Sequence, residues 1–156
     1  MTTRRSFVTQ AAGLALASIG ARRLWGIAAP GAGTAITVYK SASCGCCAKW
    51  VDHLKANGFT PTVHDDEGMD AVKDEMGVPK DVRSCHTALL GRYIVEGHVP
   101  ASDLRRLLSE KPDVAGLAAP GMPGSSPGMA MPGAAHEPFE VLAFTRDGKS
   151  TVFARH

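Results

Sequence analysis

Three of the four cysteines in this 156-residue chain fall within four residues, Cys44-Gly45-Cys46-Cys47. They follow a short apolar run and precede the start of a helical pattern. A thiolate at a helix N-terminus lies at the positive end of the helix dipole, which lowers its pKa and makes it a good nucleophile or soft-metal ligand. The pattern therefore predicts thiol redox chemistry, metal binding or both at this turn.

Hydrophobic periodicity predicts the elements that position the cysteine turn. Trp50, Val51 and Leu54 follow Cys47 at helical spacing, and Asn57-Gly58 supplies a C-terminal cap. The other predicted elements are strands over 36–40, 59–64, 87–90 and 93–95, a helix with Met69, Val72 and Met76 on its core face, and a helix that begins at Ser102 or Asp103.

The rest of the chain adds an edge strand, a long loop and a hairpin. Pro61 cannot donate to a strand ladder, so the strand that contains it is predicted at an edge. Residues 112–138 are rich in Pro, Gly, Ala, Ser and Met without periodicity, which is typical of a functional or disordered loop. Residues 139–145 and 151–155 then predict a C-terminal β-hairpin.

A strand, a Cys-x-x-Cys at a helix start and a later strand pair with a final helix resemble the thioredoxin fold, with Cys44 and Cys47 in the paired positions. The resemblance implies an α/β fold with a central mixed sheet flanked by helices. Where thioredoxin-like oxidoreductases commonly carry a proline in the motif and a cis-proline before the facing strand, this chain has Cys46 and His86. The same resemblance implies that Cys85 lies against the cysteine turn and that the loop holding His98 borders it.

The residue types favour copper among the soft metals. Cys44 and Cys47 share a helix face, whereas Cys46 points elsewhere and could bridge to a further ion. Thiolates and thioethers select Cu(I), and Met122 and Met129 lie in a loop long enough to fold over the site, whereas zinc has no need of methionine. Four thiolates would be neutralised by about four Cu(I) ions, so we predict more than one ion. The predicted ligands are Cys44, Cys46, Cys47, Cys85, His86, His98, Met122 and Met129.

Several separate motifs carry a closer resemblance. They are Tyr39-Lys40-Ser41 before the cysteine turn, Trp50, Leu54, Gly58-Phe59, Ser84-Cys85-His86-Thr87, Glu96-Gly97-His98-Val99-Pro100, Pro120-Gly121-Met122-Pro123 and Ser126-Pro127-Gly128-Met129. Together they resemble the CopG family of exported, thioredoxin-like copper-resistance proteins, long catalogued only as a domain of unknown function. The resemblance covers about residues 36–156 and implies copper binding at the cysteines and a role in envelope copper handling. The tail of the long loop departs from it by adding Met131 and His136, whose roles stay open.

The N-terminus predicts export. Thr3-Arg4-Arg5-Ser6-Phe7-Val8 has the form of a twin-arginine signal, and it is followed by an apolar stretch over 11–20 and the small residues Ile27-Ala28-Ala29. The apolar stretch is shorter than the roughly 20 residues of a membrane span and ends at Arg22-Arg23, which favours a cleaved signal over a membrane anchor. We therefore predict a signal over 1–29, one domain over 30–156 and a periplasmic location.

The net charge of the domain limits which classes of partner it is expected to bind. The chain has 17 basic and 15 acidic residues, and the signal holds four arginines and no acid, so the remaining domain has 13 basic and 15 acidic residues. Binding of a nucleic acid requires a clustered cationic face. A net charge of about −2 without a basic cluster therefore disfavours a nucleic-acid partner. The predicted partners are copper ions and other envelope copper-handling proteins, with no stable membrane insertion after cleavage.

Other interpretations of the cysteines stay open. One is a structural disulfide with a bystander thiol; another is a thiol-disulfide oxidoreductase with Cys44 as the nucleophile and Cys47 as the resolving thiol. A third is an iron-sulfur electron carrier, although three cysteines within four residues fit the usual ligand spacings poorly. Cys85, His86 and His98 could also be inert buried residues, and any catalytic role is left open. His53 and His64 are predicted to lie on the surface, and Trp50 in the core.

Overall fold

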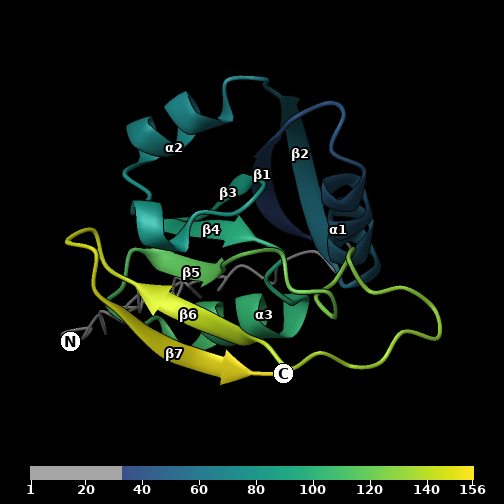
Figure 1. Ribbon diagram of the computed structural model, residues 1–156. Coiled ribbons are helices and arrows are strands. Elements are labelled where there is room, and N and C mark those ends of the chain that lie inside the picture. Colours follow the sequence, from purple (N-terminus) through teal and green to yellow (C-terminus); the bar gives the residue numbers. More distant parts are fainter. Residues whose placement is uncertain (1–32) are drawn as a thin grey trace, which may run out of the picture. The chain divides into compact units, whose positions relative to one another are not determined.

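The cysteine turn joins strand β1 (Thr34–Lys40) to helix α1 (Gly45–Ala56) in the computed structural model, which describes residues 33–156 (Figure 1). The predicted signal over 1–29 lies outside the described residues. The elements that follow are β2 (Phe59–Asp65), α2 (Met69–Met76), a 3-10 turn η1 (Lys80–Val82), β3 (Thr87–Leu90), β4 (Tyr93–Gly97), α3 (Ala101–Glu110), β5 (Gly116–Ala119), β6 (Glu140–Phe144) and β7 (Ser150–Arg155).

All of these strands form one mixed sheet in the order β2-β1-β3-β4-β5-β6-β7. The pairs β1–β2 and β4–β5 are parallel, and the other neighbours are antiparallel. The predicted α/β fold with a central mixed sheet and flanking helices is thus confirmed. The strand that contains Pro61 lies at one edge, and the predicted C-terminal hairpin forms the other.

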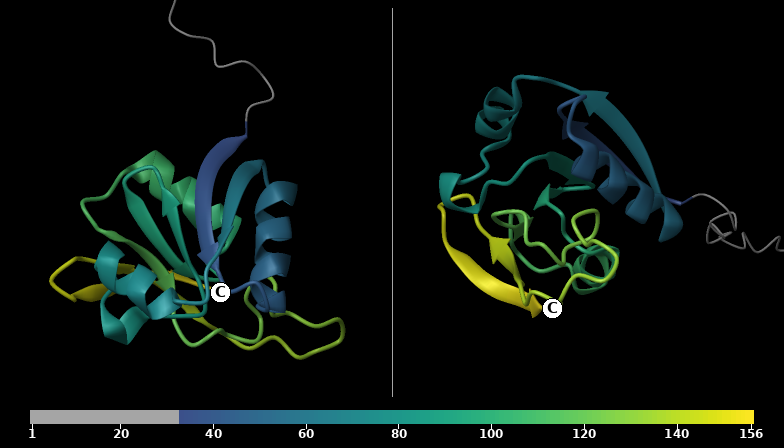
Figure 2. Two further views of the ribbon diagram at one scale, coloured as in Figure 1. Left: turned by 90° about the horizontal axis from the view of Figure 1, so that it is seen from above. Right: turned by 45° about the vertical axis from the view of Figure 1, so that its right-hand side comes forward.

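Alternation along the strands divides the core between the two faces of the sheet. Val95 and Leu117 face the larger cluster, which includes the buried face of α1 and the leucines of α3. Their neighbours Ile94 and Ala118 face a smaller cluster with Val78 and part of α2. Figure 2 shows α2 and α3 on opposite sides of the sheet. The cysteine turn follows the C-terminal end of β1 and leads directly into α1.

The predicted loop over 112–138 is wrong in its first part, because residues 116–119 form the fifth strand. β5 pairs in parallel with β4 and antiparallel with β6, and all four of its residues are buried. An added Cβ at Gly116 would lie 1.8 Å from the Ile94 carbonyl oxygen, so this close pairing requires glycine. The irregular loop therefore begins after Ala119 and ends before β6.

Helix α2 differs from its predicted packing. Met69, Val72 and Met76 are only half-buried, and the buried residue of the helix is Lys73. None of the helices in the described region combines the length and apolar character that crossing a membrane requires.

Candidate metal centre

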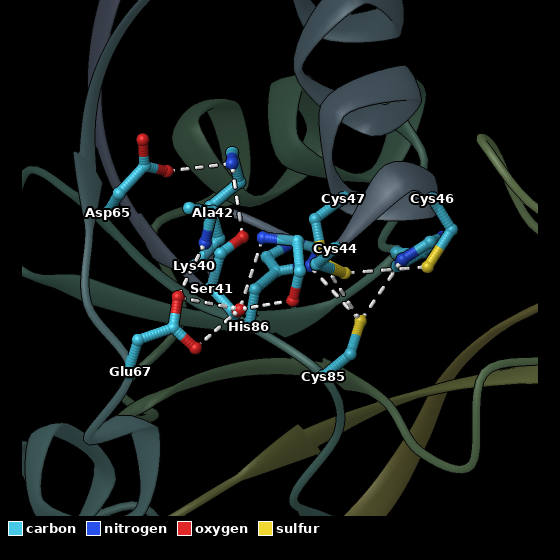
Figure 3. Close-up of a disulfide and its surroundings, with 12 residues drawn as sticks. Lys40, Ser41, Ala42, Cys44, Cys46, Cys47, Asp65, Glu67, Cys85 and His86 are labelled. Carbon is cyan, nitrogen blue, oxygen red and sulfur yellow. Dashed lines mark hydrogen bonds and ion pairs between the residues drawn. A yellow bond between two sulfur atoms is a disulfide. The ribbon is translucent and has the colours of Figure 1, made fainter.

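The cysteine turn forms the N-terminus of α1. Cys44 is the N-cap residue, and its backbone N–H donates to the Ser41 carbonyl oxygen at 3.1 Å. Glu67 ties this segment to the chain beyond β2, because its carboxylate accepts hydrogen bonds from Ser41 Oγ at 2.9 Å and from the Ala42 N–H at 3.2 Å (Figure 3). The turn is therefore held where the helix dipole favours thiolates.

The four cysteine sulfurs converge as the sequence predicts. Cys44 and Cys47 form a disulfide, whereas Cys46 and Cys85 are free thiols (Figure 3). Cys46 Sγ lies 3.6 Å from Cys44 Sγ, and Cys85 Sγ lies 3.5 Å from Cys47 Sγ. All four sulfurs lie within 4.8 Å of one another. Cys46 is thus part of the sulfur cluster and not a distant bystander.

Two imidazoles join the cluster from the side of Cys85. Cys85 Sγ lies 3.3 Å from His86 Nδ1 and 3.2 Å from His98 Nε2, and the side chains of both histidines are fully buried. Trp50, also fully buried, packs on the His86 ring with 4.3 Å between ring centroids and donates its indole N–H to the Val99 carbonyl oxygen. The predicted core role of Trp50 is confirmed, and its contact reaches the wall of the site.

Burial sets the protonation of these groups. It lowers the pKa of His86 well below its usual value, with a further decrease from the neighbouring His98, and it also lowers the pKa of His98. Both rings are therefore neutral at neutral pH, so each retains a lone pair. Burial, with a smaller contribution from Cys46, raises the pKa of the Cys85 thiol to about 11. Cys85 is thus a protonated thiol at neutral pH.

The donor set fits a soft metal ion. His86 Nε2 and His98 Nδ1, the ring nitrogens opposite those that face Cys85, have no hydrogen-bond partner among the described residues. The nitrogens that could bind an ion are those on the side of the cluster, His86 Nδ1 and His98 Nε2, which lie 3.3 Å and 3.2 Å from Cys85 Sγ. Such converging sulfur and nitrogen donors are typical ligands of copper and zinc. They form two overlapping groups, the four cysteines, and Cys47 and Cys85 with the two histidines.

The long loop lies against the cysteine turn. An added Cβ at Gly128 would lie 2.7 Å from the Cys46 carbonyl oxygen and 2.9 Å from the Trp50 nitrogen, so the loop backbone packs directly on the first two turns of α1. Met129 follows this contact and is half-buried, whereas Met122 is 42% exposed. Met131 is 72% exposed, and His136 is also exposed. Of the two predicted methionine ligands, Met129 is thus adjacent to the contact with the turn.

His53 has a role that the sequence pattern did not indicate. It was predicted to lie on the surface, but it is half-buried and its Nε2 accepts a hydrogen bond from the Ala101 N–H at 3.1 Å. Helix α3 begins at Ala101 and not at the predicted Ser102 or Asp103. Its N-cap residue is Pro100, whose side chain cannot form a capping hydrogen bond. The sequence shows that the usual Ser, Thr, Asp or Asn is missing before Ala101, but it does not identify His53 as the residue that replaces it. His64 is exposed, as predicted.

The comparisons with known proteins agree with this geometry. A family model described as a protein of unknown function, DUF411, matches residues 82–129. No curated protein matches the chain. A solved structure named copper resistance protein CopG, form 1, is 46% identical with a TM-score of 0.73, over 80% of this chain and 98% of that chain. Form 2 matches with the same identity and TM-score over 78% and 97% of the two chains. Because this identity extends over nearly the whole of those chains, the protein belongs to the CopG family.

Proposed function

We propose that this protein binds Cu(I) in the periplasm and contributes to copper tolerance by sequestering, transferring or redox-cycling the ion. The observation that carries the proposal is the convergence of four cysteine sulfurs within 4.8 Å at a helix N-terminus. The name of the solved relatives, copper resistance protein, supports copper over zinc. The proposed ligands are Cys44, Cys46, Cys47 and Cys85, with His86 and His98 and, from the loop, Met129 and Met122.

We further propose that the cluster holds more than one ion. Cys46 Sγ and Cys44 Sγ are 3.6 Å apart, and Cys85 Sγ and Cys47 Sγ are 3.5 Å apart, so each sulfur has a neighbour with which it could share an ion. A partly buried set of four thiolates would need about four monovalent ions to approach neutrality. The imidazoles of His86 and His98 add neutral donors and leave this charge balance unchanged.

The disulfide bears directly on copper binding. Two of the four sulfurs are joined to each other in the Cys44–Cys47 bond and do not act as thiolates in this form. A dithiol reductant would supply two electrons, break the sulfur–sulfur bond and leave two thiols, while the reductant becomes a disulfide. Copper then displaces the thiol protons as it binds. The fully reduced protein is therefore the form that would hold the whole cluster.

The test is a Cu(I) titration against a competing chelator, with reduced and oxidised protein in parallel. We expect more than one equivalent in the reduced protein and fewer in the oxidised protein. Cys46→Ser should lower the number of ions bound while the protein stays folded. His64→Ala, which changes an exposed ring on the edge strand, is the control and should bind as the parent does. An end point at one equivalent would contradict the cluster, and no binding would contradict the proposal.

A thiol-disulfide oxidoreductase is the second candidate function, because Cys44 and Cys47 form a disulfide at a helix start. His86 at the position where such enzymes commonly carry a proline weakens it. Insulin reduction decides between the two functions. We expect slow reduction by the parent, and His86→Pro should weaken Cu(I) binding by roughly 10 to 100-fold while reduction becomes faster. Rapid reduction by the parent with unchanged copper affinity in the variant would favour the oxidoreductase.

A further inference from the structure

A buried ion pair lies beneath the segment that carries Cys85 and His86. Lys73 of α2 and Glu96 of β4 are joined through Nζ and Oε1 at 2.6 Å, and their side chains are 4% and 0% exposed. Lys73 Nζ also donates to Thr87 Oγ1 at 2.9 Å. Removing two charges from water is costly, and a well-packed apolar pair is often as stable as a buried ion pair. Stability alone therefore does not account for this pair.

The Glu96 carboxylate holds both ends of the Cys85–His86 segment. The Ser84 N–H donates to Glu96 Oε1 at 2.6 Å, and Thr87 Oγ1 donates to Glu96 Oε2 at 2.7 Å. Ser84 and Thr87 directly flank the two proposed ligands. The segment is thus fixed before and after the residues that face the disulfide.

The residue after Glu96 fixes the middle of the same segment. The Gly97 N–H donates to the His86 carbonyl oxygen at 2.9 Å. An added Cβ at Gly97, whose φ is +71°, would lie 2.5 Å from Ser84 Oγ, so the end of β4 and the segment that contains Ser84 approach as closely as glycine allows. His98 then follows and places its Nε2 3.2 Å from Cys85 Sγ. The end of β4 therefore supplies one proposed ligand and holds the two others.

We infer that Glu96 is a positioning residue for Cys85 and His86, and that Lys73 is its counter-ion. Metal ligands bind well only when outer contacts hold them in the required geometry, and loss of such contacts typically weakens binding 10 to 100-fold. The hydrogen bond that Glu96 accepts from Ser84 fixes the backbone one residue before Cys85, whose Sγ lies 3.5 Å from Cys47 Sγ. The metal readout of this inference rests on the proposed function, whereas the geometry of the segment does not.

The test compares two double variants that both remove the buried charges. Lys73→Met with Glu96→Gln keeps a side-chain oxygen that can accept from the Ser84 N–H, whereas Lys73→Met with Glu96→Leu removes it. We expect the Cu(I) affinity of the Gln variant to stay within about threefold of the parent and that of the Leu variant to fall roughly 10 to 100-fold. Thr87→Val keeps the ion pair and the hydrogen bond from the Ser84 N–H, and it removes the two hydrogen bonds that Thr87 Oγ1 makes with Glu96 and Lys73. This variant should give a smaller decrease, and it serves if the Leu variant does not fold.

A second readout needs no copper. Amide hydrogen exchange at Ser84 and alkylation of Cys85, followed on its own peptide, are measured in the metal-free disulfide form. Both should be about tenfold faster in the Leu variant than in the Gln variant, because the flanking hydrogen bond is lost. Leu107→Ala is the control: Leu107 is buried in α3, on the other face of the sheet from α2, so its loss destabilises the fold without a specific effect at Ser84.

The outcomes separate the inference from the proposed function. Equal Cu(I) affinity and equal Ser84 exchange in the two double variants would overturn the inference, because the hydrogen bonds that only the Gln variant can keep would then have no effect. A parent that binds no copper, together with faster exchange in the Leu variant, would support the positioning role while contradicting the copper site. A loss of affinity in both variants without a difference in exchange would also overturn the inference.

Discussion

Replacing Gly128 by alanine should separate the long loop from the cysteine turn. Gly128 has a φ of +89°, and its added Cβ would lie 2.7 Å from the Cys46 carbonyl oxygen and 2.9 Å from the Trp50 nitrogen. Both atoms belong to the backbone of α1, which cannot move aside without distorting the helix. Gly133, in the same loop with a φ of +80° and no atom within 4 Å of an added Cβ, is the matched control.

The two substitutions share one cost and differ in the other. Alanine at a positive φ costs about 1–2 kcal/mol at either position. Only Gly128→Ala also crowds packed backbone atoms, which costs a further 1–3 kcal/mol or so. We therefore expect the free energy of unfolding to fall by about 1–2 kcal/mol in Gly133→Ala and by about 2–5 kcal/mol in Gly128→Ala.

Urea denaturation measures the total cost, and limited proteolysis together with alkylation of Cys46 reports whether the loop has left the turn. The Gly128 variant should be cleaved in the loop and alkylated faster than the Gly133 variant, and it should release Cu(I) faster if the loop covers the cluster. Equal stability, cleavage and alkylation in the two variants would refute the contact between the loop and the turn.

Three other predictions concern protons and export. The unfolding free energy of the metal-free protein should decrease as the pH falls below about 6.5, by about 1.4 kcal/mol per pH unit for each histidine. The reason is that His86 and His98 have lowered pKa values in the folded protein, so only the unfolded chain binds these protons. Urea denaturation at several pH values that shows no such decrease would contradict the neutral state of the two rings. The apparent Cu(I) affinity should rise with pH, by about tenfold per pH unit for each thiol proton that the ion displaces. Cys85 contributes to this rise because its pKa is raised to about 11. A flat pH profile in chelator competition would exclude Cys85 as a thiolate ligand. Changing Arg4 and Arg5 to lysine should keep the precursor in the cytoplasm, as fractionation would show, and normal processing of that variant would refute the twin-arginine signal.

The sequence predicted most of the fold because most elements carry their own local signal. β5 is the exception, since Gly116-Leu117-Ala118-Ala119 has no β-branched or aromatic residue. It becomes a strand because its backbone pairs with β4 on one side and β6 on the other. A strand defined by its neighbours and not by its side chains cannot be recognised from periodicity.

The convergence of the predicted cysteines and histidines was accessible because the resemblance to the thioredoxin fold implied which loops meet. The supporting residues were not. Lys73 is 23 residues from its partner Glu96, and a lysine on a helix is ordinarily assigned to the solvated face. His53 similarly caps a helix that begins 48 residues later. Such pairings depend on distances that only the folded sheet defines.

The Cys44–Cys47 bond encloses very little chain, since its cysteines are three positions apart. The loop-entropy relation assigns about 2 kcal/mol to a closed loop of about four residues, against about 3 kcal/mol for a loop of 15, because few conformations of the unfolded chain are lost. The bond therefore contributes little as a brace for the sheet, whose stability comes from its two apolar faces. Opening it should leave the rest of the chain folded, so the turn can gain or lose two electrons as a local event.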